Sequence, residues 1–192
     1  MISRAVGVQA EYSNAVEKAT GGQAPERGWN LKWQAPGAGR LKLNTDAAFR
    51  ENDKLGMGAV LRDECGDVLV AVCNSWHGRC EVEVGEAMAV REGIRVAMEA
   101  GFHGFIVETD CMTLFEALKR KRRPASVLGR ILQDIYVLIS SCTNVTFSFV
   151  RRSGNEVAHL LAKRSLESDE LLVWLEEAPE FVMPSVALDV SG

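Results

Sequence analysis

Apolar and polar residues alternate along three stretches of the chain, which predicts three consecutive β-strands. The stretches are residues 41–49, 54–63 and 67–76. Only Glu64-Cys65-Gly66 separates the second stretch from the third, and a short gap that contains glycine is typical of a hairpin turn. We therefore expect a meander of three strands at the start of the folded domain.

From residue 82 the hydrophobic period changes to that of a helix. At about 100° per residue, Ala87, Val90 and Ile94 gather on one arc of the segment 82–101. Gly101 is a natural end for this helix. The elements predicted after it are a strand at 105–110, helices at 112–121 and 127–140, a strand at 144–152 and a helix at 154–167.

The predicted element order is βββαβααβα, which indicates an α/β fold. A meander followed by alternating strands and helices favours a five-stranded mixed sheet with helices on both faces. Gly56 and Gly58 in the second strand indicate either a sheet edge or the close approach of another backbone.

We divide the chain into three parts on the same pattern. Residues 1–32 lack clear periodicity, and we expect a flexible arm there with a short helix over residues 12–19. Residues 33–168 form the folded domain. Residues 169–192 form a C-terminal tail that packs on the domain or trails from it.

The composition is that of an ordinary globular protein, with 47% hydrophobic and 25% charged residues in 192. A net charge of −4 argues against a globally basic nucleic-acid binder but allows a local basic groove. Five cysteines without a Cys-x-x-Cys pair favour a reduced intracellular protein, nuclear or cytoplasmic. No apolar run has membrane-spanning length and residues 1–10 lack a signal-peptide core, so we expect no membrane association.

Three acids occupy positions that solvation alone does not explain. Asp46 lies where the first strand ends, Glu86 lies on the apolar side of the first helix, and Asp110 ends the fourth strand. Carboxylates that converge at strand ends repel one another unless a divalent cation neutralises them. Oxygen ligands suit Mg²⁺ or Mn²⁺. A two-metal carboxylate site supports phosphodiester hydrolysis, since one ion activates water and the other stabilises the leaving oxygen.

Each acid also has an ordinary structural interpretation. Asp46 could cap a turn, Glu86 could be a helix N-terminal acid favoured by the macrodipole, and Asp110 could be the N-cap of the helix at 112–121. Singly, these roles are the more common ones. Together, at one edge of an α/β sheet, the three acids favour a metal site.

Several short motifs follow one another from about Trp33 to Leu166 and into the tail. They are Trp33-x-x-Pro36, Leu41-Lys42-Leu43-Asn44-x-Asp46-x-Ala48, Gly58-Ala59-Val60-Leu61-Arg62-Asp63, Glu86-Ala87-x-Ala89, Val107-Glu108-Thr109-Asp110, Val150-x-Arg152-x-x-Asn155-x-Val157-Ala158-His159-x-Leu161-Ala162 and Trp174-Leu175-x-x-x-Pro179-x-Phe181. With these motifs the chain resembles the plant ribonuclease H-like domain of retroelement-derived, reverse-transcriptase-like proteins. Each motif is short, and the specificity lies in the ordered set.

The resemblance implies an RNase H-like fold and Mg²⁺-dependent cleavage, with Mn²⁺ as a possible substitute, of the RNA strand of RNA–DNA hybrids. It assigns Asp46, Glu86 and Asp110 as catalytic, metal-binding carboxylates. His159 stands at a fourth catalytic position that is often aspartate in the family, and histidine is the poorer magnesium ligand. Asn155, one turn earlier, matches an asparagine that supports the site and the substrate.

Two departures from the family pattern keep a second hypothesis open. His159 replaces the usual aspartate, and the loop at 151–154 is short and has no histidine of the kind thought to aid product release. We therefore also consider a domesticated nucleic-acid-binding or interaction module that keeps the fold with weak or no turnover. A transposase or exonuclease of the same fold is disfavoured because the extra segments of those families are missing.

Basic residues indicate where a nucleic acid binds. Arg151 and Arg152, beside the expected site, are candidates for contact with the substrate backbone. The run Lys119-Arg120-Lys121-Arg122-Arg123 favours phosphate contact or nuclear import over a simple solvated helix end. The expected partner is an RNA–DNA hybrid, and we expect the protein to be a monomer.

Overall fold

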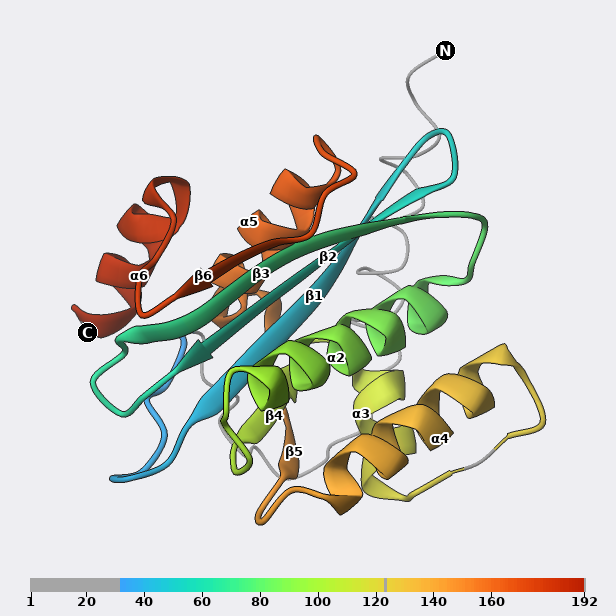
Figure 1. The fold of residues 1–192 in the computed structure, drawn as a ribbon, viewed down its shortest axis with the longest axis horizontal. Helices are drawn as coiled ribbons and strands as arrows, with labels where there is room; N and C mark the ends of the chain where they lie inside the picture. Colours follow the sequence, from blue (N-terminus) through green and yellow to red (C-terminus); the bar gives the residue numbers. More distant parts are fainter. Residues whose placement is uncertain (1–31, 123, 192) are drawn as a thin grey trace, which may run out of the picture.

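The computed structural model describes residues 32–122 and 124–191, and Figure 1 gives the path of the chain. The short helix predicted over residues 12–19, the rest of the arm up to residue 31, and Arg123 of the basic run lie outside the described residues. The elements are β1 (Lys42–Arg50), β2 (Lys54–Arg62), β3 (Val68–His77), α2 (Val82–Glu99), β4 (Ile106–Thr109), α3 (Met112–Lys119), α4 (Val127–Ser140), β5 (Thr146–Phe149), α5 (Glu156–Ser165), β6 (Leu172–Leu175) and α6 (Met183–Val190), with short 3₁₀ turns at Arg152–Gly154 and Glu180–Val182.

The strands form one mixed sheet in the order β5-β4-β1-β2-β3-β6. Strands β1, β2 and β3 are the predicted antiparallel meander, and β4 and β5 run parallel to β1 and to each other. The prediction of five strands was wrong, because Leu172–Leu175 adds a sixth strand antiparallel to β3. The sequence Leu-Val-Trp-Leu has no polar alternation, so its strand character is not visible in the pattern.

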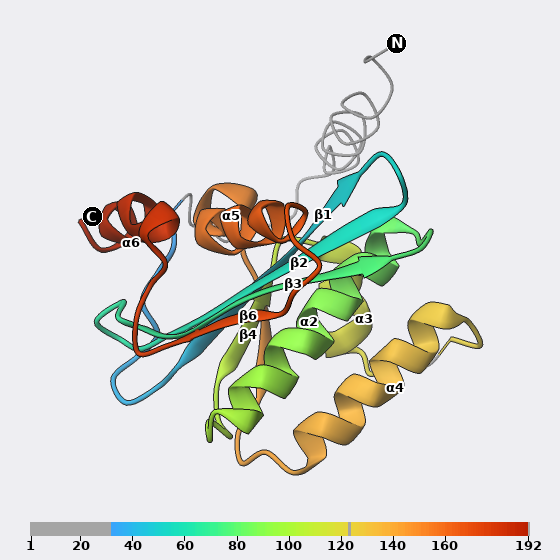
Figure 2. The ribbon, with the colours of Figure 1, turned by 45° about the horizontal axis from the view of Figure 1, so that its top comes forward.

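Helices cover both faces of the sheet, as predicted (Figure 2). Helices α2, α3 and α4 lie on one face, and α5 and α6 lie on the other. The predicted apolar arc of α2, with Ala87, Val90 and Ile94, is fully buried in the main core. No helix in the described part of the chain is both long and apolar enough to cross a membrane.

The two glycines of β2 allow α5 to lie directly on the sheet. A Cβ atom at Gly58 would lie 2.3 Å from the backbone of Ala158 and Ala162, and one at Gly56 would lie 2.2 Å from the carbonyl oxygen of Ala162. The prediction of a close backbone approach is therefore confirmed, whereas the alternative of a sheet edge is wrong because β2 is a central strand.

The predicted hairpin between β2 and β3 is confirmed. The Asp63 carboxylate accepts hydrogen bonds from the backbone N–H of Cys65 at 2.9 Å and of Asp67 at 3.0 Å. Gly66 has φ +87°, a conformation that glycine adopts without a steric penalty. The aspartate side chain and the glycine together fix this turn.

Candidate active site

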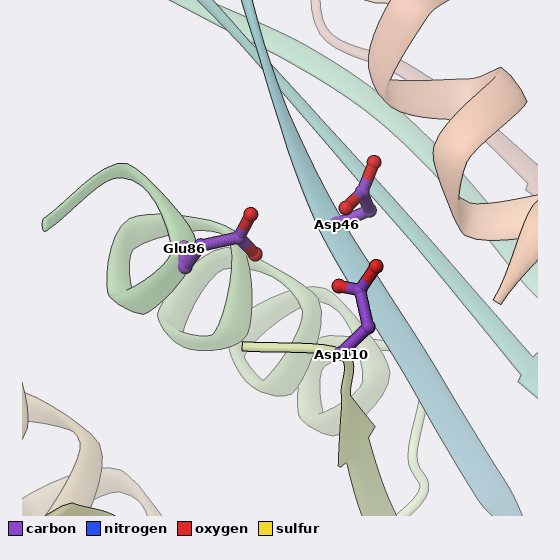
Figure 3. A group of neighbouring side chains, drawn as sticks. All are labelled: Asp46, Glu86 and Asp110. Atoms are coloured by element: carbon purple, nitrogen blue, oxygen red, sulfur yellow. The ribbon is translucent and has the colours of Figure 1, made fainter. Parts of the chain in front are cut away.

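Three carboxylates from distant parts of the chain converge at the C-terminal end of strand β4. Asp46 lies in β1, Glu86 lies in α2, and Asp110 directly follows β4. One ligand oxygen from each lies within 4.8 Å of the others, and Figure 3 shows the three side chains pointing toward a common point. The structure thus brings together the three acids that the sequence selects.

The register of the sheet explains why two of these acids meet. Strands β1 and β4 are parallel neighbours in which Thr45 lies opposite Thr109, so the residues that follow them, Asp46 and Asp110, are side by side. The sequence had suggested that Asp46 ends its strand, but in the structure it does not. Strand β1 continues to Arg50 because it pairs with β2 beyond the point where β4 stops.

The ordinary structural roles considered for these acids do not match the geometry. The N-cap residue of α3 is Cys111, whose backbone N–H donates to the hydroxyl oxygen of Thr109, so Asp110 does not cap this helix. The acid in the first turn of α2 is Glu83, whereas Glu86 lies a turn further on and is buried. Asp46 lies inside a strand and not in a turn.

Burial and mutual repulsion make this cluster electrostatically unfavourable without a cation. Desolvation, and then the charges of Asp46 and Asp110, raise the pKa of Glu86 well above its usual range. Desolvation, followed by the charge of Asp46, raises the pKa of Asp110 to about 7, although Arg152 opposes this shift. A bound cation would reverse both effects.

The donor set fits a divalent metal ion. One carboxylate oxygen of Glu86, Oε2, is buried and has no hydrogen-bond partner among the described residues. An unsatisfied buried carboxylate oxygen is costly unless a ligand completes it. Three carboxylates provide hard oxygen ligands of the kind that bind Mg²⁺ and Mn²⁺. Asp46, Glu86 and Asp110 are therefore the residues that could hold a metal.

His159 reaches the same site from α5. Its Nδ1 lies 2.7 Å from Oδ2 of Asp46, and both side chains are buried. The guanidinium of Arg152 lies against the imidazole, with Nη2 at 3.1 Å from Nε2 and 3.2 Å from Nδ1. His159 thus contacts the Asp46 carboxylate on one side and the positively charged guanidinium of Arg152 on the other.

Asn155 supports the carboxylates from the start of α5. Its side-chain amide donates to the carbonyl oxygen of Thr45 at 2.9 Å and its side-chain oxygen accepts from Asn44 at 3.2 Å. A side-chain hydrogen bond with Asp110 lowers the pKa of that carboxyl, against the larger effect of burial. The backbone oxygen of Asn155 accepts from the N–H of His159. Both residues selected on this helix therefore lie at the site.

Behind the carboxylates lies a second layer of buried polar groups, most of which the sequence reasoning missed. Asn44 accepts from the indole of Trp33 at 3.0 Å and donates to Glu108 at 3.1 Å. Glu108 also forms an ion pair of 3.0 Å with Lys42. The alternation of β1 places Lys42 and Asn44 on the face of Asp46, and the same argument applied to β4 would have found Glu108.

Arg62 and Asp189 complete this layer, and no local signal indicated them. The guanidinium of Arg62 lies 3.9 Å from the centre of the Trp33 ring and 3.3 Å from the oxygen of Asn44. Its other terminal nitrogen forms an ion pair of 2.7 Å with Asp189 of α6. A chain of contacts therefore runs from the C-terminal helix to Asn155 and the carboxylates.

The comparison with protein families assigns the chain. The model of the reverse transcriptase-like family matches residues 44–165, which is more than half of the sequence. The chain belongs to the reverse transcriptase-like family. This match confirms the reverse-transcriptase-like family that the sequence motifs indicated. No curated protein sequence matches the chain.

Solved structures show that this reverse transcriptase-like chain has the RNase H-like fold. RNase H1 of Halobacterium salinarum is 23% identical, with a TM-score of 0.61 over 67% of this chain and 98% of that protein. LC11-RNase H1, obtained from compost and solved in complex with an RNA/DNA hybrid, is 18% identical with a TM-score of 0.60 over 67% and 97%. LC9-RNase H1, a type 1 enzyme with the type 2 active-site motif, is 16% identical with a TM-score of 0.61 over 82% and 87%.

An open groove of about 810 Å³ in this reverse transcriptase-like domain is lined by residues of α2, of α3 and of the segment that leads into α4. Its lining includes Glu83, one turn before Glu86, and Met112, two residues after Asp110. Arg120 and Arg122 of the basic run also line it. Arg151 precedes the 3₁₀ turn before α5 and is exposed. Glu83 and Glu116 also line the groove, and Arg120 forms an ion pair with Glu116, so the charge of the two arginines is partly offset there.

Proposed function

We propose that the protein is a divalent-metal-dependent endonuclease that hydrolyses the RNA strand of RNA–DNA hybrids. The observation that carries this proposal is the buried carboxylate cluster of Asp46, Glu86 and Asp110, with an oxygen of Glu86 that no described residue satisfies. The family and the RNase H-like fold support it, because the same fold occurs in a protein solved with an RNA/DNA hybrid.

In this proposal Asp46, Glu86 and Asp110 would hold two Mg²⁺ ions, for which Mn²⁺ could substitute. Bound there, such ions supply Lewis acidity to a phosphodiester and make water a better nucleophile near neutral pH. The three carboxylates fix the negative charge that retains the ions. His159 holds Oδ2 of Asp46, and Asn155 holds Asp110 and the β1 backbone, so the ligand oxygens are positioned before substrate arrives.

The basic residues would bind the substrate backbone. Arg120 and Arg122 line the groove that also includes Met112, two residues after Asp110, and Arg151 is exposed at the start of the turn before α5. Arg152 is also available on the site side of that turn, where it contacts His159. Since phosphate contacts dominate nucleic-acid affinity, a chain with a net charge of −4 needs such a local arrangement.

Cleavage of a labelled RNA–DNA hybrid by the purified protein and by Asp46→Asn tests the proposal. We expect the wild type to cut the RNA strand and to leave duplex DNA and single-stranded RNA intact. Asp46→Asn should lower the rate by at least about a thousandfold, because it removes one charged ligand from the cluster. Asp67→Asn in the exposed β2–β3 hairpin is the matched control and should cleave normally.

The second candidate is a binding module with weak or no turnover. The contact of His159 with Asp46, in place of a fourth carboxylate, favours it. Tight binding of the hybrid without cleavage under both Mg²⁺ and Mn²⁺ would support the module and reject the nuclease. Undiminished cleavage by Asp46→Asn would reject the carboxylate assignment itself.

A further inference from the structure

Strand β6 is the outer strand of the sheet on the side away from β5 (Figure 1). The N–H of Glu176 donates to the carbonyl oxygen of Leu69 on β3, at 2.9 Å. Backbone groups of an antiparallel strand alternate in direction, so the N–H and C=O groups of Leu172 and Trp174 also point toward β3. The N–H and C=O groups of Val173 and Leu175 therefore point away from the sheet, and no described strand pairs with them.

An apolar row of side chains runs beside these unpaired backbone groups. Leu171, Val173 and Leu175 are 46%, 41% and 57% exposed, whereas the intervening Leu172 and Trp174 pack toward the core under α5 and α6. Natural sheets usually protect an edge with lysine, proline or a bulge. Residues 171–175 contain neither lysine nor proline, and their pairing with β3 is regular.

The C-terminal segment that contains this edge carries charge of one sign. Residues 165–192 contain seven acidic residues and no Lys, Arg or His, whereas the first 164 residues contain all 22 basic residues and the other 19 acids. Glu170 precedes the apolar row, and Glu176 and Glu177 follow it. None of these three glutamates forms an ion pair with a described residue, while nearby Asp169 is held by Lys54 and His77.

These charges select among the possible occupants of the edge. A second copy that paired antiparallel through β6 would bring Glu170 of each copy close to Glu176 or Glu177 of the other, and like charges across a strand pair are destabilising. A nucleic acid would be repelled by the same glutamates. A strand with apolar alternate residues and basic residues at both ends satisfies the backbone, the apolar row and the charge.

We propose that the free edge of β6 is a docking site for an extended basic segment of a partner protein, which adds to the sheet as a seventh strand. The partner strand would donate to and accept from the outward backbone groups of Val173 and Leu175. Its apolar side chains would cover the row at residues 171–175, and its lysines or arginines would meet Glu170, Glu176 and Glu177. This inference does not depend on the proposed nuclease activity.

A labelled peptide of sequence Lys-Arg-Val-Thr-Ile-Thr-Val-Arg-Lys tests the proposal by fluorescence anisotropy at low salt. We expect saturable binding to the full chain and slowed amide hydrogen exchange at Val173 and Leu175. The same peptide with glutamate in place of its four basic residues should not bind. No saturable binding of the basic peptide, or equal binding of the acidic one, would overturn the proposal.

Variants of the protein identify the edge. Val173→Pro removes an N–H that points outward and none that bonds to β3, so the sheet should persist while affinity falls about tenfold. Val173→Thr keeps the N–H and should bind nearly as the wild type does. Replacing Glu170, Glu176 and Glu177 together by glutamine leaves the backbone intact and should also weaken binding about tenfold at low salt.

Two results would reject this occupant in favour of another. A concentration-dependent dimer in sedimentation that Val173→Pro abolishes would assign the edge to a second copy. Hybrid binding weakened by the glutamine substitutions would assign it to nucleic acid. Full peptide affinity in both Val173→Pro and the glutamine variant would place the peptide elsewhere.

Discussion

The carboxylates of the candidate site are residues whose burial costs much free energy when no positive charge compensates them. Asp46 and Glu86 are nearly inaccessible to water, and Asp110 adjoins both. Proteins do not usually bury ionised carboxylates without a compensating charge. The electrostatic cost of burying this cluster therefore supports the proposed binding of a divalent ion, whose charge would offset the repulsion between the carboxylates.

The metal-free protein should lose stability as the pH rises. The folded pKa of Asp110 is about 7 against an ordinary 3.8, so the folded protein binds the more protons. Its stabilising contribution is complete below about pH 4 and is lost as the pH rises through 7. Because Asp110 is partly exposed, we expect a loss of only about 1–2 kcal/mol between about pH 5 and pH 8.

Thermal unfolding in the presence of EDTA measures this effect, with Asp110→Asn as the comparison. The variant cannot ionise at this position, so the difference in stability between it and the wild type should grow with pH. Comparing the two proteins cancels the titration of the histidines. Parallel pH profiles for wild type and variant would contradict the electrostatic account.

His159 should act by holding Asp46, which predicts a change in turnover more than in substrate affinity. His159→Ala removes the contact of 2.7 Å to Oδ2 of Asp46, and we expect kcat on the hybrid to fall about tenfold with little change in KM. His77→Ala alters an exposed histidine paired with Asp169 and serves as control. An unchanged kcat for His159→Ala would show that this contact does not position the carboxylate.

The sequence predicts the three acids because each breaks a local rule that a single window reveals, whereas His159 is predicted only through the family resemblance. An acid on an apolar helix face or in a strand is visible without knowing the fold. Arg62 and Asp189 break no such rule, since arginine at a strand end and aspartate near a chain end are ordinary. Their ion pair joins positions 127 residues apart, and only the tertiary structure brings them together.

Among the elements, α5 depends on the glycines of β2 for its place over the active site. Gly58→Ala would insert a methyl group 2.3 Å from the α5 backbone, so the helix that carries Asn155 and His159 must shift. We expect a loss of about 2–3 kcal/mol in the free energy of unfolding, measured in urea. Gly37→Ala, where nothing lies within 4 Å, should unfold as the wild type does.

Helix α6 should be held to the domain by Asp189. Asp189→Ala leaves the guanidinium of Arg62 buried without its carboxylate, and we expect the free energy of unfolding to fall by about 2–4 kcal/mol. Glu167→Ala removes an exposed partner of Arg164 and should have little effect. Equal destabilisation by the two substitutions would contradict the structural importance of the buried pair.

For the molecule as a whole, the order of the elements from β1 to α5 was predictable, but the sixth strand at the edge of the sheet was not. The meander, the alternating second half and the helices on both faces follow from hydrophobic period alone. Strand β6 was missed because its four residues are apolar throughout and its place is set by β3 and α6, not by its own sequence. Most of the polar layer behind the carboxylates was missed for the same reason, because tertiary contacts bring its residues together and no local sequence pattern shows that Arg62 and Asp189 belong to it.

Charge is also organised at the scale of the molecule. Arg152, in the turn before α5, contacts His159 at the carboxylate site, and Arg120 and Arg122 line the groove along α3, whereas residues 165–192 carry only negative charge. A net charge of −4 conceals this division. We infer that the protein separates a nucleic-acid face from an acidic edge at β6.

The central claim is that Asp46, Glu86 and Asp110 bind divalent ions that support hydrolysis of the RNA strand. The most direct test is a titration of hybrid cleavage with Mg²⁺ and with Mn²⁺, using separate labels on the RNA and DNA strands, for the wild type and Asp110→Asn. We predict cleavage confined to the RNA strand, absent in EDTA, saturable in either metal and nearly abolished in Asp110→Asn. Cleavage that persists in EDTA or in Asp110→Asn, or hybrid binding without cleavage at any metal concentration, would contradict it.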